Sequence, residues 1–235
     1  MHQTLLIIIP ARNEQDTVGA AIAIAEAADG VQAGPGDQVS VLEENVGPVR
    51  CAVRLGAGKA SFAEFDLPRK SVRLDATFDR QALADAFSLK PAQIGFENHQ
   101  PMLWSAGVAF VMVPVHDLAA AAAVEFDPTL WERCAPFAEG RLASAYLYCR
   151  GGVNHNAKFH TRMFAPDMGI SEDPATGAAV AAMSGAIHFF DKPVDGHHPY
   201  LIEQGVEMGR PSLIHLHLDV FGGSIAGARI GGEAV

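Results

Sequence analysis

Hydrophobic residues follow two different spacings in the first part of the chain. Residues 4–9 form a continuous apolar run that ends at Pro10, a pattern typical of a buried strand. The Ala-rich stretch 18–29 comes next and predicts a helix that closes near Gly30. Apolar and polar residues then alternate, and this period of two predicts an antiparallel meander with strands over 39–44, 48–55 and 59–67.

Helical and strand-like stretches continue to follow one another along the rest of the chain. Asp79 and Asp117 each precede a helical stretch and are suited to cap it. Helices are expected over 80–89, 118–124 and 177–190, and strands over 107–115, 141–149, 158–165, 200–204, 212–220 and 224–235. Residues 94–101 have no clear period, which predicts a domain boundary there.

Two short segments resemble each other and favour a duplicated plan. Residues 17–21 (Thr-Val-Gly-Ala-Ala) and 175–179 (Ala-Thr-Gly-Ala-Ala) each begin an Ala-rich helix that antiparallel strands follow. The sequence therefore predicts two similar halves that combine helix and sheet. We expect the first over residues 1–95 and the second over 96–235, with the last strands able to return to the first half.

Composition and charge narrow the class of protein. The chain has 235 residues, of which 49% are hydrophobic, and a formal net charge of −10. An acidic chain without a Lys/Arg run is a poor partner for nucleic acid or an anionic membrane. Cys51, Cys134 and Cys149 lie far apart, as expected for free thiols in a reducing compartment. No apolar run is long enough for a signal peptide or a membrane span, so we expect a cytoplasmic protein.

The segment 169–179 is the strongest candidate for a binding site. Its small residues Thr176, Gly177 and Ala178 begin a helix, and the first N–H groups of a helix have no helical partners. Together with the helix dipole they favour a bound carboxylate or phosphate. Glu172 and Asp173 precede this seat, and as a local pattern two acids before a helix most often cap it.

The same segment carries a resemblance to a known family. TRMFAPDMGISEDPATGAAVAAM (161–183) closely resembles the signature of the phenazine-biosynthesis-like (PhzF-type) isomerases, which have the diaminopimelate-epimerase-like fold. Further similar stretches are LEENVGPVRCAV (42–53), SAGVAFVMVP (105–114) and EQGVEMGRPSLI (203–214). The resemblance implies an α+β fold of two similar halves. Each half would be a curled, mostly antiparallel sheet around a central helix, with the active site between them.

The resemblance also implies roles for particular residues. Asp173 matches the family's catalytic aspartate, and Gly177 and Ala178 match a Gly-Ser pair whose amides hold the substrate carboxylate, with Thr176 beside them. In the first half, Gln15 and Asp16 stand where the family has His and Pro. The family's catalytic glutamate lies further upstream. We therefore expect the first half to be incomplete and the proton-transfer machinery to be impaired.

These expectations define one leading function and two alternatives. The leading function is a cofactor-independent isomerase or epimerase that moves a proton on a small carboxylate-bearing metabolite, with Asp173 as acid/base and with Gln15, Thr176, Gly177 and Ala178 in contact with substrate. A sheet edge left open by missing strands would favour a homodimer. The first alternative is a catalytically inactive module that binds a small carboxylate or mediates oligomerisation. The remote alternative is a family-2 glycosyltransferase, which residues 4–22 resemble, although the chain contains no Asp-x-Asp triplet.

The remaining candidates for chemistry are weaker. Glu14 and Asp16 precede the first helix and could replace the missing base, but nothing in their spacing indicates that they do. His215 and His217 alternate on one strand face, where two solvated imidazoles are expected, because no third ligand lies nearby in the sequence. The cysteines are not at the helix starts where a cysteine-dependent epimerase needs them. We therefore expect no metal and no cofactor.

Overall fold

A computed structural model describes residues 37–44, 46–54 and 61–234. The predicted first strand, the helix over 18–29 and the candidates Glu14, Gln15 and Asp16 lie outside this range. Among the helices within it, none combines the length and the apolarity needed to cross a lipid bilayer.

One large sheet organises the described residues. Its strand order is β1-β2-β3-β14-β13-β12-β10-β9-β6-β5-β4, with β11 paired to β10. The strand bounds are β1 Asp37–Glu44, β2 Gly47–Arg54, β3 Ser61–Asp66, β4 Val72–Leu74, β5 Met102–Ser105, β6 Ala109–Pro114, β9 Ser144–Arg150, β10 Phe159–Ala165, β11 Ile170–Asp173, β12 Gly196–Gln204, β13 Ser212–Phe221 and β14 Ser224–Ala234. Strands β7 (Phe137–Ala138) and β8 (Arg141–Leu142) form a separate hairpin. All pairs in the large sheet are antiparallel except β10–β12 and β6–β9.

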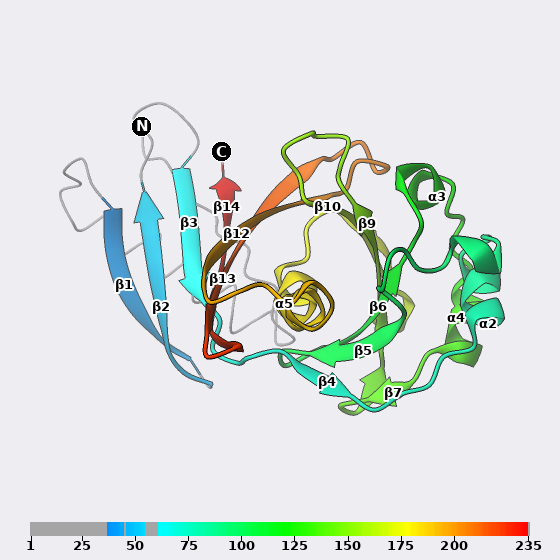
Figure 1. The fold of residues 1–235 in the computed structure, drawn as a ribbon, viewed down its shortest axis with the longest axis horizontal. Helices are drawn as coiled ribbons and strands as arrows, with labels where there is room; N and C mark the ends of the chain where they lie inside the picture. Colours follow the sequence, from blue (N-terminus) through cyan, green and yellow to red (C-terminus); the bar gives the residue numbers. More distant parts are fainter. Residues whose placement is uncertain (1–36, 45, 55–60, 235) are drawn as a thin grey trace.

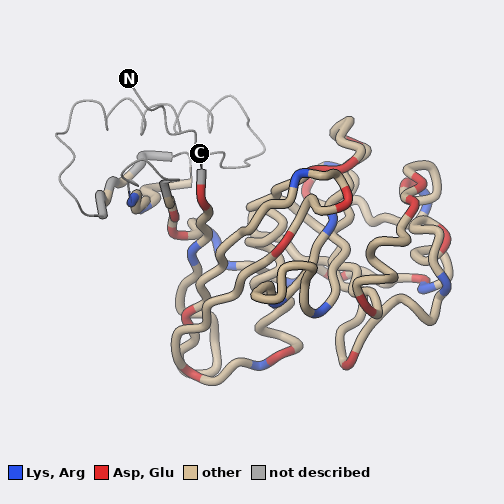
Figure 2. The backbone as a smooth tube through the Cα atoms, turned by 90° about the horizontal axis from the view of Figure 1, so that it is seen from above, with Lys and Arg blue, Asp and Glu red and all other residues tan. Residues whose placement is uncertain are grey.

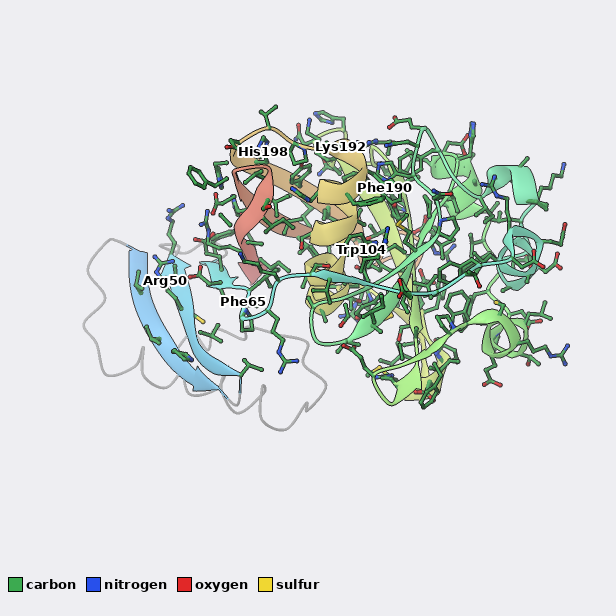
Figure 3. The ribbon with its side chains drawn as sticks, turned by 60° about the horizontal axis from the view of Figure 1, so that its bottom comes forward. Arg50, Phe65, Trp104, Phe190, Lys192 and His198 are labelled. Carbon is green, nitrogen blue, oxygen red and sulfur yellow. The ribbon has the colours of Figure 1, made fainter. Side chains whose placement is uncertain are left out.

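The sheet curls around helix α5 (Gly177–Asp191), which lies inside its curve (Figure 1). The predicted α+β class, a mostly antiparallel curled sheet around a central helix, is confirmed. The helix is rich in Ala and Gly because strands approach it closely on several sides. A Cβ added at Gly185 would lie 2.5 Å from the Trp104 ring and from Oγ of Ser71, so only glycine fits there. Figure 3 shows Trp104 beside the helix.

The outer face of the same sheet carries a second hydrophobic core. Helices α2 (Arg80–Ala86), α3 (Leu118–Ala122) and α4 (Pro128–Cys134) lie on this outer side (Figure 1). Three aspartates cap them through backbone N–H groups: Asp79, Asp117 and Asp127. The first two caps are as predicted, whereas α4 was not expected. Two 3-10 turns, η1 (Pro91–Gln93) and η2 (Pro166–Met168), complete the elements.

The first strands of the described chain join the rest through its last strand. Strands β1, β2 and β3 pair in sequence, which confirms the predicted meander, and β14 pairs with β3. Strand β4 pairs with β5. The sheet is thus continuous across residue 95, and the division at that residue stays a prediction. Acidic and basic residues are spread over the whole described chain, in which no long basic stretch occurs (Figure 2).

Candidate active site

The start of helix α5 leaves backbone N–H groups available for an anion. Thr176 is the N-cap residue, and its side chain makes no capping hydrogen bond. The N–H groups of Ala179 and Val180 both donate to the Thr176 carbonyl, at 3.2 and 3.1 Å. Within the described residues nothing accepts from the N–H groups of Gly177 and Ala178, and both residues are half-buried. A helix N-terminus with free amides is an anion-binding site.

The two acids before the helix do not cap it, so the capping interpretation of Glu172 and Asp173 is wrong. Both residues belong to strand β11, whose alternation sends them to opposite faces of the sheet. Asp173 pairs with Met163, which packs on the α5 side. Glu172 faces outward and accepts two hydrogen bonds from Arg162, at 2.8 and 2.9 Å. Adjacent carboxylates therefore have different partners.

The Asp173 carboxylate is fixed by one neighbouring hydroxyl. Oγ1 of Thr176 donates to Oδ2 of Asp173 at 2.5 Å, and Thr176 is buried. None of the described residues donates to Oδ1. Among the described residues one carboxylate oxygen therefore has a donor and the other has none, on a half-buried side chain close in sequence to the Gly177 and Ala178 amides.

Gln204 binds the backbone on both sides of this loop. It ends strand β12 and is completely buried. Its Nε2 donates to the Asp173 carbonyl at 2.7 Å and to Oγ1 of Thr176 at 2.9 Å. Its Oε1 accepts from the Thr176 N–H at 3.3 Å and lies 3.2 Å from the hydroxyl of Tyr146, whose one proton is shared between this oxygen and Oγ1 of Thr161 at 3.1 Å. Burial raises the pKa of Tyr146 far above its ordinary value, so this hydroxyl stays protonated.

A turn after β12 supports the loop from behind. Gly205 has φ +80°, and a Cβ there would lie 2.8 Å from the Pro174 carbonyl oxygen.

Glu207 in the same turn binds Nε2 of His160 at 2.9 Å, while Glu203 binds Nδ1 at 2.8 Å. Burial lowers the pKa of His160, but the two carboxylates outweigh it, and the net shift is upward. Both ring nitrogens face carboxylates, so the geometry suits the imidazolium form.

The structure brings together four of the five residues that the sequence singled out as the site. Thr176, Gly177 and Ala178 lie at the helix start beside Asp173, and Gln15 is outside the described residues. Sequence reasoning missed Gln204, Arg162 and His160. Gln204 lies in the stretch EQGVEMGRPSLI, but no local pattern shows that a residue at position 204 reaches a loop at position 173.

The weaker candidates occupy separate places. His215 and His217 alternate on the outer face of β13, as predicted, and His197 from β12 stacks on His217 with ring centroids 5.2 Å apart. The described residues contain no group of three His, Cys, Asp or Glu side chains arranged to hold a metal ion. Cys134 and Cys149 are free thiols, and burial raises the pKa of Cys149 to about 12.

The fold and the site define a class of protein: a sheet curled around a helix, with first-turn amides that no described residue binds, next to a half-buried carboxylate. Comparisons with known proteins identify the family. The family described as phenazine biosynthesis-like protein matches residues 15–235, and the chain belongs to it. An uncharacterized isomerase of Mesorhizobium japonicum is 52% identical over 220 residues, which cover 93% of this chain and 71% of that protein.

Two further relatives agree with this assignment. A trans-2,3-dihydro-3-hydroxyanthranilate isomerase of Pseudomonas fluorescens is 39% identical over 69 residues, which cover 29% of this chain and 23% of that protein. The crystal structure of a PhzF-family phenazine biosynthesis protein from Bacillus anthracis is similar in fold, with a TM-score of 0.75 and 16% identity, and the match covers 97% of this chain and 77% of that one. The chain is thus of the isomerase type by family.

Proposed function

We propose that the chain is a cofactor-independent isomerase that moves a proton on a small carboxylate-bearing metabolite. The observation that carries the proposal is the proximity, within six residues, of Oδ1 of Asp173 and the amides of Gly177 and Ala178, none of which has a hydrogen-bond partner among the described residues. The amides would hold the substrate carboxylate, because charge-assisted hydrogen bonds and the helix dipole both favour an anion there. The relative that isomerises trans-2,3-dihydro-3-hydroxyanthranilate supports this class of substrate.

In the proposed reaction Asp173 transfers the proton. Its Oδ1 takes a proton from a carbon of the substrate, the electron pair of the broken C–H bond stays on the substrate, and the proton returns to carbon in the product. A positioned acid/base group contributes about two to four powers of ten in rate. The partner acid/base that this chemistry needs is proposed at Glu14 or Asp16, which flank Gln15, the residue that stands in place of the family's histidine.

The test is deuterium incorporation. A panel of small carboxylates that includes trans-2,3-dihydro-3-hydroxyanthranilate is incubated with the protein in D2O and followed by proton NMR. We expect label at a carbon of at least one compound, and a rate about 10² to 10⁴ lower for Asp173→Asn, which keeps the shape and the acceptor for Thr176. Exchange that Asp173→Asn leaves unchanged would refute the assignment. Binding without any exchange would favour the inactive binding module.

A second pair of variants tests the anion seat. Gly177→Pro removes one N–H at the first helical position, where proline is well tolerated, whereas Gly177→Ala keeps it. Loss of one hydrogen bond to a charged group costs about 1.5–3 kcal/mol. We expect calorimetry to show carboxylate binding weakened by about 10- to 100-fold in the proline variant relative to the alanine variant. Equal binding by the two variants would exclude the helix start as the seat.

A further inference from the structure

The amide of Gln204 can take only one orientation. Its Nε2 faces the carbonyl oxygen of Asp173, which only accepts, and its Oε1 faces the N–H of Thr176, which only donates. Exchanging the amide nitrogen and oxygen would break both contacts. The side chain is completely buried, so water cannot replace either partner.

This orientation determines the direction of the Thr176 hydroxyl. Oγ1 of Thr176 accepts from Nε2 of Gln204 at 2.9 Å. The single proton of the hydroxyl is then directed at the other polar neighbour, Oδ2 of Asp173, at 2.5 Å. The hydroxyl oxygen accepts from none of the described first-turn N–H groups, so Thr176 does not cap the helix through its side chain.

The hydroxyl in turn makes the two oxygens of Asp173 unequal. Oδ2 accepts a short hydrogen bond from the Thr176 hydroxyl, whereas no described residue donates to Oδ1. The Asp173 carbonyl is bound to the same amide at 2.7 Å, so the backbone that carries the carboxylate is also held. The hydroxyl of Tyr146 on strand β9 lies 3.2 Å from Oε1 of Gln204 and 3.1 Å from Oγ1 of Thr161, so its proton is shared between these two acceptors.

We propose that Gln204 is a positioning residue: it orients the Thr176 hydroxyl onto Oδ2 of Asp173 and so leaves Oδ1 as the oxygen that exchanges a proton with substrate. This inference rests on the proposed function for its catalytic consequence. The orientation of the hydroxyl stands on the contacts alone and is measured without substrate.

The first experiment observes the Thr176 hydroxyl proton by NMR of the whole chain labelled with ¹³C at threonine or, for Thr176→Ser, at serine. We expect a slowly exchanging hydroxyl resonance, far downfield, that disappears in Thr176→Val and is retained in Thr176→Ser. In Gln204→Met, which keeps the side-chain length without hydrogen-bonding groups, it should move upfield or be lost. An unchanged resonance in Gln204→Met would overturn the proposal.

The second experiment uses the deuterium-exchange assay with whichever carboxylate of the panel the wild type labels. We expect Gln204→Met and Thr176→Val each to lower kcat by about 10- to 100-fold with KM within about threefold, and Thr176→Ser to restore most of the rate. Because one residue acts through the other, the double variant should lose no more than either single one. Multiplied losses would overturn the proposal. A Gln204-dependent hydroxyl signal in a protein that labels no carboxylate would refute only the proposed function.

Discussion

The turn at Gly205 offers a direct test of how the site is supported. A Cβ placed there would lie 2.5 Å from the Arg210 carbonyl oxygen, 2.8 Å from the Pro174 carbonyl oxygen and 2.9 Å from the Pro174 Cα. All three atoms belong to backbone, so no side chain can swing away. Ordinary contact begins at 3.4 Å, and Gly205→Ala must therefore move the Pro174 peptide by about 0.6 Å.

Two costs add in this variant. An alanine at φ +80° costs about 1–2 kcal/mol. Overpacking against fixed backbone costs about 1–3 kcal/mol more. Gly209 is the matched control, because it lies in the same turn at φ +67° with nothing within 4 Å of an added Cβ. Gly209→Ala should carry the conformational cost alone.

Urea unfolding of the two variants separates these costs. We expect Gly205→Ala to lose about 2–5 kcal/mol of unfolding free energy and Gly209→Ala about 1–2 kcal/mol. The amide resonances of Asp173 and Gly177 should shift only in the first variant. Deuterium exchange should fall there by up to about 10²-fold, since a displacement approaching 1 Å has such an effect. Equal losses of stability with unmoved resonances would refute the argument that the turn supports the loop.

Three further predictions concern groups behind the site. Glu172→Gln should cost about 2 kcal/mol of stability in urea unfolding, because Arg162 loses a charged acceptor, yet leave deuterium exchange within about twofold. The pKa of His160 is raised above 6.5, so its contribution to stability is complete below pH 6.5 and is lost as the pH rises through the folded pKa. Burial raises the pKa of Glu207, but His160 outweighs burial and leaves this pKa below 4.5, so the pair should stabilise the fold most between about pH 4.5 and 6.5. In a thermal-unfolding series over pH, His160→Gln should therefore reduce the loss of stability on the alkaline side. Cys149, whose pKa burial raises to about 12, should react with an aromatic disulfide at pH 8 only after unfolding.

The spacing of apolar residues predicted those helices and strands whose apolar positions face the core in the structure. The alternation over 212–220 and the Ala-rich run after Gly177 correspond to β13 and α5, within a few residues at each end. The helix α4, Pro128–Cys134, was missed because its seven residues are too few to establish a period, although Asp127 and Pro128 are a cap and a first-turn residue. Strand β5, Met102–Ser105, directly follows the stretch 94–101 that shows no clear period, and it was not predicted.

Only the part of the site that lies in one contiguous segment, residues 173–178, was predicted from the sequence motif. Asp173 and the helix start are contiguous, and the sequence places them together. Gln204 reaches them because β12 runs parallel to β10, a pairing between strands about forty residues apart that no local pattern encodes. The first-half candidates, Gln15 among them, remain predictions.

Glu172 and Asp173 were misinterpreted as helix caps because strand β11 was not predicted from the sequence. As residues of a loop before a helix, both were natural caps. As residues of a strand they must point to opposite faces, and the face of each follows from β10, where Met163 packs on the α5 side and Arg162 does not. The strand thereby separates two adjacent carboxylates, one into an ion pair that secures β11 and one toward the helix start. Strand alternation, more than the residue type, directs Asp173 toward the helix start and Glu172 toward Arg162.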